Sequence, residues 1–500
     1  MKGEKMVGIK SYGVYIPYYR MNRAEIFNTW LTTPSPMRGE RSVANFDEDS
    51  LTMAVAAGID CLTGFKRKDV DALYTCSTTF PYREKLSSAT VAMALDLRDS
   101  IRTADFANSL RCAHIGLSSA LDAIEAGSAG TVLVTASDCR LGAPGGEFEQ
   151  SLGDGGAAFL LGKEDLIAEV EGRYTITDEF CGMWRSHEDT FIRMWEDRMV
   201  HDEGYSKIME MALSSALRKA SLTMANFAKV VYDAPADIRR HTMLARKLGI
   251  GKEQLQSPFF EQIGNTGTAM AGMMLVAAME EAKAGDRILF ASYGNGADVF
   301  ILTVTDGISR VRNRGTFTRQ LNSKKMIYNY SSYLRWRNIV TMEKAKRPDL
   351  QPTSISNLRR NAKILLSLYG VKCKKCGTPQ YTQAGLLSSY VMPQRVCVEC
   401  GAKDQFDDYP FYDKRGTIYS YTQDKLAPSL DPPLTVAIVD FEGGGRAAFE
   451  MTDRDPNEVK VGMPVELTFR KLFYERGIHN YYWKARPVGS QGGNGKCQEA

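Results

Sequence analysis

Two stretches of the chain share one pattern of hydrophobic and polar positions. Residues 117–137 and 274–292 each read as an apolar-periodic helix, a glycine-containing turn and a strand of branched residues that ends in Ala-Ser. A glycine-rich turn follows each strand, and then comes a second apolar strand, at 157–162 in one copy and 298–304 in the other. Four elements in the same order predict a duplicated α/β unit rather than two unrelated helix–strand pairs.

The hydrophobic pattern changes twice towards the C-terminus. Residues 306–360 show weak periodicity and carry 13 Lys and Arg against three Asp and Glu, which predicts a basic linker or arm packed on the surface. Such a run is usually a solvated face, and it also suits an anionic partner such as a phosphate-bearing ligand. From residue 370 onward, short alternating strands are separated by Gly, Pro and Asp turns, which is typical of a small all-β barrel.

Four cysteines near the start of the all-β region have the spacing of a metal site. Cys373, Cys376, Cys397 and Cys400 form the pattern C-x2-C-x20-C-x2-C, and a glycine follows each pair. Two such turns bring four thiolates to one tetrahedral centre, the geometry that Zn²⁺ accepts. Because four thiolates leave no open position for water, we expect a structural zinc ion, with other thiolate-binding metals as the alternative.

Composition narrows the class of protein. The 500 residues are 44% hydrophobic and 24% charged, close to ordinary globular usage, and the formal net charge of +4 is too small to indicate nucleic acid as the main partner. The N-terminus lacks the apolar run of a secretory signal, and no stretch approaches the ~18 apolar residues that span a membrane. We therefore expect a cytoplasmic protein without a membrane partner, whose 10 cysteines are reduced, metal-bound or catalytic.

These features divide the chain into six parts. We expect two α/β halves, then the basic linker, a zinc ribbon, a small barrel and a disordered tail rich in Gly and Gln. The expected boundaries are, in this order, 1–165, 166–305, 306–369, 370–404, 405–488 and 489–500.

The first 305 residues carry several recognisable motifs, namely GIKSYGVYIPYYR, EDSLTMAVAAG, SLGDGGAAFLLG, GNTGTA and SYGNGA. With these motifs, residues 6–305 resemble the thiolase superfamily, and most of all its 3-hydroxy-3-methylglutaryl-CoA synthase branch. Residues 370–488 resemble the zinc-ribbon/OB-fold proteins that accompany such enzymes. The resemblance implies a duplicated, five-layered αβαβα thiolase-like fold, followed by a rubredoxin-like zinc ribbon and a small all-β OB-fold. It also implies acyl-CoA thioesters as substrates and a homodimer.

The positions of the catalytic groups in such synthases are occupied differently here. The family's cysteine nucleophile follows an Asp-x-x-Asn-Ala stretch, whereas in this chain Asp105-Phe-Ala-Asn-Ser leads into Leu110. The family's glutamate lies in a Ser-Glu-Ser-x-Pro context where this chain has Thr78, and its histidine precedes x-Pro where this chain has Asp233. A leucine cannot form an acyl-enzyme, so the resemblance implies the frame of the site without its usual chemistry.

Aldol chemistry without a covalent intermediate is the mechanism that we favour from the sequence. An aldol or retro-aldol step needs a base for the hydroxyl proton and donors that hold the developing enolate oxygen. Asp233 is a candidate base, and His114, four residues after Leu110 on one face of an expected helix, is another. Tyr293 and Asn265 are candidate donors to the enolate. Some thiolase-fold aldolases of steroid side-chain breakdown, which also pair with zinc-ribbon/OB partners, work without the cysteine.

Two other functions fit the same sequence. In the first, Cys112 replaces the missing nucleophile in a Claisen-type acyltransferase, although two positions along a helix rotate a side chain by ~200°. The simpler interpretation of Cys112 is a small apolar residue packed in a buried helix. In the second, the chain is a non-catalytic subunit that binds acyl-CoA or passes substrate to a separate thiolase.

The remaining candidates concern the CoA portion of the substrate. Trp184 and Arg185 are expected to line the acyl-CoA entrance or only to pack, and Gly294 and Gly296 lie in the turn that matches the family motif. The aromatic strand 481–483 is a candidate for stacking on an adenine, or it fills the barrel core. No motif supports a role for His187, His201, His241 and His479.

Overall fold

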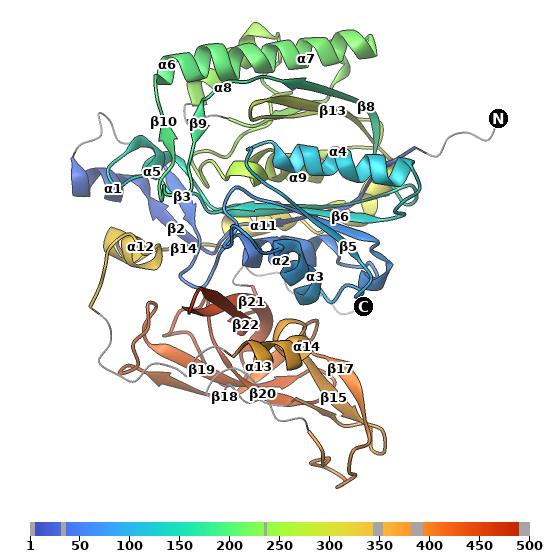
Figure 1. The fold of residues 1–500 in the computed structure, drawn as a ribbon, viewed down its shortest axis with the longest axis vertical. Coiled ribbons are helices and arrows are strands. Elements are labelled where there is room, and N and C mark those ends of the chain that lie inside the picture. The colour runs from blue at the N-terminus through green and yellow to red at the C-terminus, as the bar shows by residue number, and fades with distance from the viewer. Residues whose placement is uncertain (1–5, 32–36, 235–237, 344–353, 382–393, 490–500) are drawn as a thin grey trace, which may run out of the picture.

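A nine-stranded mixed sheet forms the body of the N-terminal part (Figure 1). The computed structural model describes residues 6–31, 37–234, 238–343, 354–381 and 394–489. All but the first residue of the expected tail lie outside these ranges. The strands lie in the order β11 (Lys229–Tyr232), β12 (Arg287–Tyr293), β13 (Gly296–Val304), β8 (Ala168–Thr177), β1 (Gly8–Tyr15), β7 (Gly155–Gly162), β6 (Val132–Asp138), β4 (Ala72–Cys76) and β5 (Arg102–Phe106).

The strand order contains the expected duplication. On one side of the sheet β4 is parallel to β6, which is antiparallel to β7. On the other side β11 is parallel to β12, which is antiparallel to β13. Helix α4 (Cys112–Glu125) precedes β6 and helix α9 (Met270–Glu281) precedes β12, so helix, strand, turn and strand recur in the predicted order. The two sides join where Gly8 and Ile9 of β1 pair with β8.

The elements stack in five layers (Figure 1). One layer is the half of the sheet that contains β8, β11, β12 and β13, and another is the half that contains β1, β4, β5, β6 and β7. Helices α4 and α9 lie between these two halves, and further helices cover their outer faces. Ten of the 12 residues of α9 are buried, as expected of a helix that is apolar on every face. Other short and covering elements of this part are α2 (Ser50–Cys61), η1 (Arg67–Asp69), α3 (Ser87–Ala94), α5 (Glu147–Ser151), α7 (Lys207–Ala220), η3 (Met224–Asn226) and α8 (Ile238–Lys247).

The segment 306–369 differs from the surface linker that the sequence predicts. Its aromatic residues Phe317, Tyr333 and Trp336 are buried, and its strand β14 joins β2 and β3 in a small sheet. Its helices have only four to seven residues, too few to show a helical period in the hydrophobic pattern. The elements are β2 (Tyr19–Asn22), α1 (Arg23–Trp30), β3 (Glu40–Val43), η5 (Asp306–Ile308), α10 (Ser309–Arg312), α11 (Thr316–Asn322), β14 (Lys325–Met326), α12 (Tyr330–Trp336), α13 (Ile355–Arg360) and α14 (Ala362–Leu366).

Two small β units complete the chain. A three-stranded ribbon is followed by five antiparallel strands in the order β20, β19, β18, β21 and β22. The aromatic side chains 481–483 are buried. Tyr482 stacks on Phe449 within the barrel, whereas Trp483 Nε1 donates to the Leu366 carbonyl of α14 at 2.8 Å. The bounds are β15 (Tyr369–Cys373), β16 (Pro379–Gln380), β17 (Phe406–Pro410), β18 (Gly416–Asp424), β19 (Leu434–Phe441), β20 (Arg446–Glu450), β21 (Pro464–Glu475) and β22 (Ile478–Pro487).

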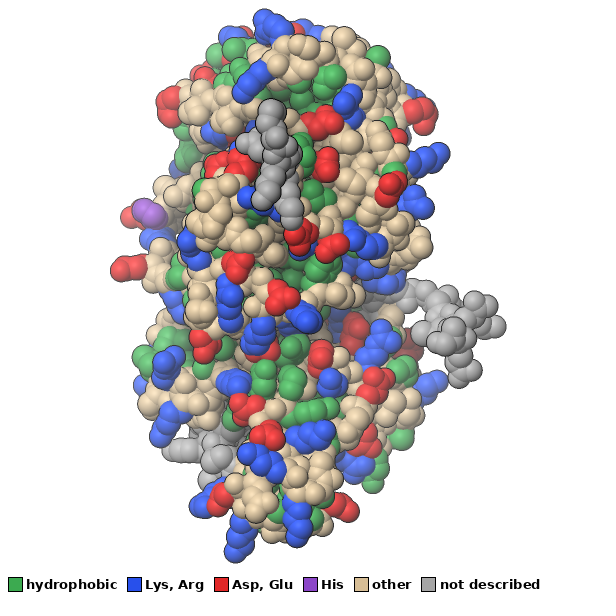
Figure 2. All heavy atoms as spheres, turned by 90° about the vertical axis from the view of Figure 1, so that its right-hand side faces the viewer, with side chains coloured by type: hydrophobic (Ala, Val, Ile, Leu, Met, Phe, Trp, Pro, Cys, Tyr) green, Lys and Arg blue, Asp and Glu red, His purple; other side chains and the backbone are tan. Residues whose placement is uncertain are grey.

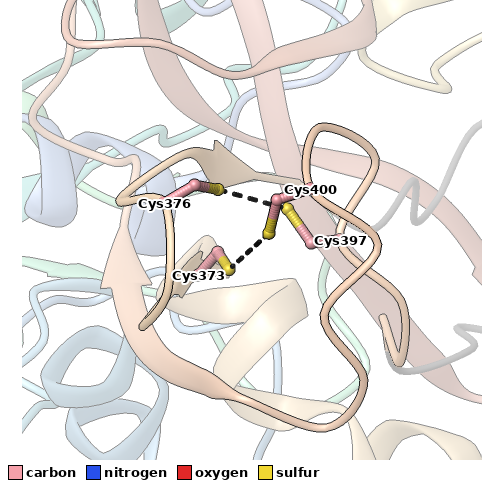
Figure 3. A group of neighbouring side chains, drawn as sticks. All are labelled: Cys373, Cys376, Cys397 and Cys400. Atoms are coloured by element: carbon pink, nitrogen blue, oxygen red, sulfur yellow. Dashed lines mark hydrogen bonds between the residues drawn. The ribbon is translucent and has the colours of Figure 1, made fainter.

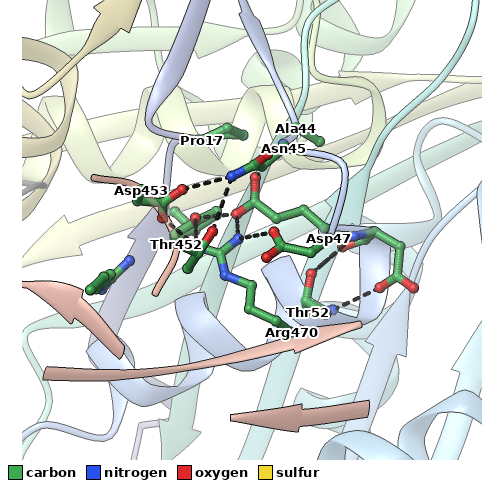
Figure 4. Close-up of polar contacts among 12 residues, drawn as sticks. Pro17, Ala44, Asn45, Asp47, Thr52, Thr452, Asp453 and Arg470 are labelled. Atoms are coloured by element: carbon green, nitrogen blue, oxygen red, sulfur yellow. Dashed lines mark hydrogen bonds and ion pairs between the residues drawn. The ribbon is translucent and has the colours of Figure 1, made fainter. Parts of the chain in front are cut away.

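A buried cluster of charged residues joins the barrel to the α/β part, as Figure 4 shows in part. Arg470 on β21 forms ion pairs with Glu48 and Asp453, and all three side chains are almost completely buried. Lys484 on β22 lies 3.0 Å from the carboxylate of Asp47. Because a buried charge that loses its partner is costly, these pairs hold the barrel in one fixed position.

Cationic and anionic side chains alternate on the outer surface that Figure 2 shows, where Lys and Arg are interspersed with Asp and Glu. Green apolar side chains occur between them rather than in one continuous patch. No helix among the described residues is long and apolar enough to cross a bilayer.

Candidate functional site

A small pocket collects side chains from both halves of the duplicated unit. Its free space of about 20 Å³ is close to the space that one water molecule needs. The segments around it include β9 (Met183–Trp184), β10 (Arg193–Met194), α6 (Asp197–Met199), the π-helix η2 (Val200–Ser206) and η4 (Gly267–Ala269). The lining residues are Leu110, Met183, Val200, His201, Tyr205, Asp233, Ala234, Asn265, Gly267 and Tyr293.

Asp233 follows directly after β11, beside the end of β12, because the parallel register places Tyr232 opposite Ala291. Its carboxylate accepts hydrogen bonds from Ser292 Oγ at 2.9 Å and from the backbone N–H of Tyr293 at 3.1 Å. Burial raises the pKa of Asp233 to about 7, and the two hydrogen bonds oppose this rise only in part. A carboxyl group that titrates near neutral pH is well suited to proton transfer.

Leu110 lines the pocket at the position where the resemblance expects a cysteine. Its loop is fixed to the turn between β12 and β13. Arg111 Nε donates to the Gly294 carbonyl at 2.7 Å, and the Arg111 guanidinium pairs with Asp298 at 3.0 Å. Ser109 Oγ donates to the same carbonyl at 2.9 Å. Among the described residues that line the pocket, none is a cysteine, so this space offers no thiol for acyl transfer.

The two glycines predicted to bind the cofactor have a packing role in this turn. A Cβ atom on Gly294 would lie 2.8 Å from the backbone nitrogen of Arg111, so no larger residue fits there. Gly296 has a φ of +113°, which residues with a side chain rarely adopt. Neither glycine lines the pocket, and a contact between them and CoA stays a prediction.

Cys112 and His114 are not among the residues that line the pocket. Cys112 is 1% exposed, and a hydrogen bond with Cys76, together with burial, raises the pKa of its thiol well above the usual value. His114 is also buried, with its ring 4.2 Å from that of Phe290, and burial lowers its pKa to about 3. The structure thus leaves both of these catalytic candidates outside the lining residues, in a helix that begins only at Cys112 rather than at Leu110.

Asn265 and Tyr293 do line the pocket, together with Asp233. Arg140 Nη2 donates to Asn265 Oδ1 at 2.8 Å, and Asn265 Nδ2 donates to the Ala234 carbonyl at 2.9 Å. Because an amide nitrogen carries two hydrogens, one N–H of Asn265 is left for a ligand. Burial raises the pKa of Tyr293 to about 12, so its phenol stays protonated and can donate to an anion.

Trp184 and Arg185 lie next to Met183, which lines the pocket. The Trp184 side chain is 36% exposed, and Arg185 Nη2 donates to the Thr78 carbonyl at 2.6 Å. Thr78 is where the resemblance expects a glutamate, and its backbone N–H donates to Asp138 Oδ1 at 2.8 Å. An exposed ring and a guanidinium thus lie close to the pocket, where they can meet the part of a ligand that remains outside it.

Sequence reasoning missed the contribution of η2. His201 and Tyr205 of this segment line the pocket, and the Tyr205 hydroxyl donates to the Asp233 carbonyl at 2.8 Å. No motif surrounds either residue, and no sequence pattern distinguishes a π-helix from an α-helix. Their position could be known only once β11 and η2 had been placed side by side. π-Helical turns occur often at functional sites.

The ribbon brings the four motif cysteines together, as predicted (Figure 3). All four Sγ atoms lie within 4.8 Å of one another, and the Cys376–Cys397 and Cys373–Cys400 pairs are 3.5 and 3.7 Å apart. A tetrahedral zinc ion with Zn–S bonds of ~2.3 Å requires S···S distances of roughly 3.8 Å. The observed S···S distances are close to this value and much longer than the ~2.05 Å S–S bond of a disulfide. The four thiols therefore fit a zinc ion.

Several proteins that are similar in sequence are hydroxymethylglutaryl-CoA synthases. The protein of Methanococcus vannielii is 30% identical over 353 residues, which are 68% of this chain and 100% of that protein. The proteins of Methanocaldococcus jannaschii and Pyrococcus horikoshii are each 30% identical, with 67% of this chain and 100% and 97% of theirs covered. Residues 411–470 match the family model described as ChsH2, C-terminal OB-fold domain.

Solved structures give the same result for the fold. A hydroxymethylglutaryl-CoA synthase in complex with CoA has a TM-score of 0.60 at 18% identity, covering 70% of this chain and 94% of its own. The β-ketoacyl-acyl-carrier-protein synthase III of Thermus thermophilus has a TM-score of 0.55 at 22% identity, covering 60% and 99%. The predicted thiolase-like architecture with a C-terminal OB-fold is therefore confirmed.

Proposed function

Because the chain belongs to the hydroxymethylglutaryl-CoA synthase family of the thiolase superfamily, we propose that it makes or breaks a carbon–carbon bond in acyl-CoA without an acyl-enzyme. The observation that carries this proposal is Leu110, which lines the pocket where the resemblance expects the nucleophile, while no cysteine occurs among the described lining residues. A reaction in this pocket must leave the thioester attached to CoA, and aldol chemistry meets that condition.

The proposed step is an aldol addition or its reverse. In the cleavage direction, the Asp233 carboxylate takes the proton of the 3-hydroxyl group of a 3-hydroxyacyl-CoA. The bond between C2 and C3 breaks, and C3 becomes a carbonyl carbon. The electron pair of the broken bond forms the enolate of the shortened thioester. The Tyr293 phenol and the second N–H of Asn265 donate hydrogen bonds to the enolate oxygen. A proton then returns to C2, so atoms and electrons balance without an oxidant or reductant.

The substrate would be held partly outside the pocket. We propose that Trp184 and Arg185 contact the CoA portion, because they are exposed beside Met183. A related fold binds CoA, and the hydroxymethylglutaryl synthase of curacin biosynthesis, with a TM-score of 0.58 and 17% identity, was solved with a donor acyl carrier protein. For this chain we propose free acyl-CoA as the substrate.

The C-terminal units would support this site rather than take part in the reaction. Four thiolates at tetrahedral distances would hold a zinc ion that fixes the ribbon and offers no open position for substrate. We retain the division of the chain at residues 165, 305, 369, 404 and 488 as part of the proposal. We also retain a cytoplasmic homodimer, for which the edge strand β5 offers unpaired backbone groups.

The other two functions considered from the sequence have less support. A Claisen-type reaction through Cys112 would need a thiol that is buried, has a raised pKa and lies outside the pocket lining. A purely channelling subunit would have no use for a buried carboxyl group whose pKa is raised to about 7 inside a pocket.

Cleavage of a 3-hydroxyacyl-CoA tests the proposal. The purified full-length chain is incubated with 3-hydroxy-3-methylglutaryl-CoA and with simpler 3-hydroxyacyl-CoAs, and release of the shortened acyl-CoA is followed by chromatography. We expect cleavage of at least one substrate and its loss in Asp233→Asn. Cleavage that appears only after a separate thiolase is added would instead support the channelling function.

A further inference from the structure

A histidine that belongs to no sequence motif lines the pocket beside an aspartate. The His201 side chain is 3% exposed, and its Nε2 lies 3.0 Å from Asp197 Oδ1, one helical turn earlier in the chain. An aspartate at this distance orients the ring and favours the proton on Nε2. Nδ1 then carries the lone pair that can accept a proton.

The local structure brings this pair close to the groups of the proposed reaction. A Cβ atom on Gly204, in the same π-helix, would lie only 2.7 Å from the Tyr293 hydroxyl, so η2 and the end of β12 are in close contact. Tyr205 adds a hydrogen bond to the Asp233 carbonyl at 2.8 Å. Both His201 and Asp233 line the pocket, so a substrate group that enters it meets both side chains.

The proposed aldol step needs two proton transfers, at the 3-hydroxyl oxygen and at C2. The Asp233 carboxylate serves the first, and a second acid–base group is required for the other. We propose that His201, oriented by Asp197, transfers the proton at C2 of the acyl-CoA thioester. This inference rests on the proposed function.

One proton moves between His201 and C2 in condensation and in cleavage alike. In condensation, neutral His201 takes a proton from C2, and the electron pair of that C–H bond becomes the enolate. In cleavage, protonated His201 returns the proton to C2 of the enolate and is neutral again. His201 is therefore proposed as a catalytic residue, and Asp197 as a residue that positions it.

Hydrogen–deuterium exchange at C2 isolates this transfer, because it needs no carbon–carbon chemistry. Acetyl-CoA is incubated with the full-length chain in D2O, and deuterium in the acetyl group is measured by mass spectrometry. We expect His201→Asn to lower the exchange rate by about 100-fold or more. Asp233→Asn should retain exchange while it loses cleavage of 3-hydroxy-3-methylglutaryl-CoA.

Chemical rescue separates a catalytic role from a structural one. Added imidazole should restore exchange in His201→Ala, whereas a variant that has only lost packing would not respond. His187→Asn is the matched control, because His187 is exposed in the same region and does not line the pocket. It should exchange like the wild type. Circular dichroism and zinc content verify the fold of each variant.

The outcomes distinguish the inference from the proposed function. Wild-type cleavage with unchanged exchange in His201→Asn, or with no exchange at all, would overturn the role of His201 and leave the aldol proposal standing. Exchange lost in Asp233→Asn but retained in His201→Asn would also overturn it, because the two roles would be reversed. A wild-type chain that neither cleaves nor exchanges would overturn both.

Discussion

The ribbon and the pocket use cysteine in opposite ways. In the ribbon, four thiols from two short motifs meet within 4.8 Å. In the pocket, where the family resemblance expects one reactive thiol, Leu110 takes its place and the nearby Cys112 is packed away from the lining residues. The difference fits the proposal that this chain uses its ribbon cysteines for structure and the oxygen and nitrogen groups of its pocket for proton transfer.

Breaking the ribbon should give the largest effect. Cys373→Ser removes one of four thiolates, and a zinc ion held by four thiolates contributes directly to folding, with apparent binding free energies of ~10–16 kcal/mol in small zinc domains. We expect loss of zinc and rapid hydrogen exchange across residues 369–410, measured by mass spectrometry. Full zinc occupancy and unchanged protection in this variant would contradict the assignment.

Removing the carboxylate from the pocket should have the next largest effect. Asp233→Asn keeps the size of the side chain but cannot take a proton, so cleavage should fall by about 10²–10⁴-fold. Zinc content and folding should not change, because the two sites are separate. Steady-state kinetics with 3-hydroxyacyl-CoA measure this effect, and a decrease of less than about threefold would exclude Asp233 as the base.

The pH dependence of cleavage also tests whether Asp233 is the base. The raised pKa of about 7 means that Asp233 is mostly protonated below neutral pH and becomes a base only as the pH rises. Cleavage measured as kcat/KM should therefore increase roughly tenfold per unit between about pH 5 and 7 and then level off. A profile that is flat over this range, or the same rise in Asp233→Asn, would show that another group is titrating.

Placing a thiol in the pocket would remove the difference between the ribbon, which has cysteines, and the pocket, which has none among its described lining residues. Leu110→Cys places a thiol among the lining residues, and incubation with acetyl-CoA should then produce a protein mass increased by one acetyl group. Leu110→Ala is the control, since it opens the same space without a nucleophile. No adduct in Leu110→Cys, or an equal adduct in Leu110→Ala, would contradict this view of the pocket.

Substitution of Cys112 should have the smallest effect of all these changes. Cys112→Ala removes a buried sulfur that packs in α4, so we expect a loss of about 1 kcal/mol in the free energy of unfolding. The cleavage rate should remain within about twofold of the wild type. Chemical denaturation and kinetics measure the two quantities, and a loss of activity without a loss of stability would point to a catalytic thiol.

The two regions also differ in how far the sequence predicts them. Two local C-x2-C motifs define the ribbon, so the spacing of the cysteines alone predicts its four metal ligands. The family resemblance identifies Asp233, Asn265 and Tyr293, and all three line one pocket. His114 does not share a helix face with Leu110, because the predicted helix includes Leu110 whereas α4 begins at Cys112.

Other features depend on contacts that no local pattern carries. The pocket role of His201 arises from a π-helix packed against the end of β12, and the buried aromatic residues of the expected linker belong to helices too short to show a period. The ion pair of Arg470 with Glu48 likewise joins segments far apart in the chain. Long-range contacts of this kind appear only once the elements are placed in three dimensions.

The absence of an acyl-enzyme is the central claim, and intact-mass spectrometry during turnover tests it most directly. The wild-type chain is mixed with the acyl-CoA that it cleaves and quenched with acid while the reaction proceeds. We predict that the protein mass stays that of the free chain although product accumulates. A protein population heavier by one acyl group, mapped by peptide analysis to Cys112 or any other cysteine and formed as fast as turnover, would contradict the account.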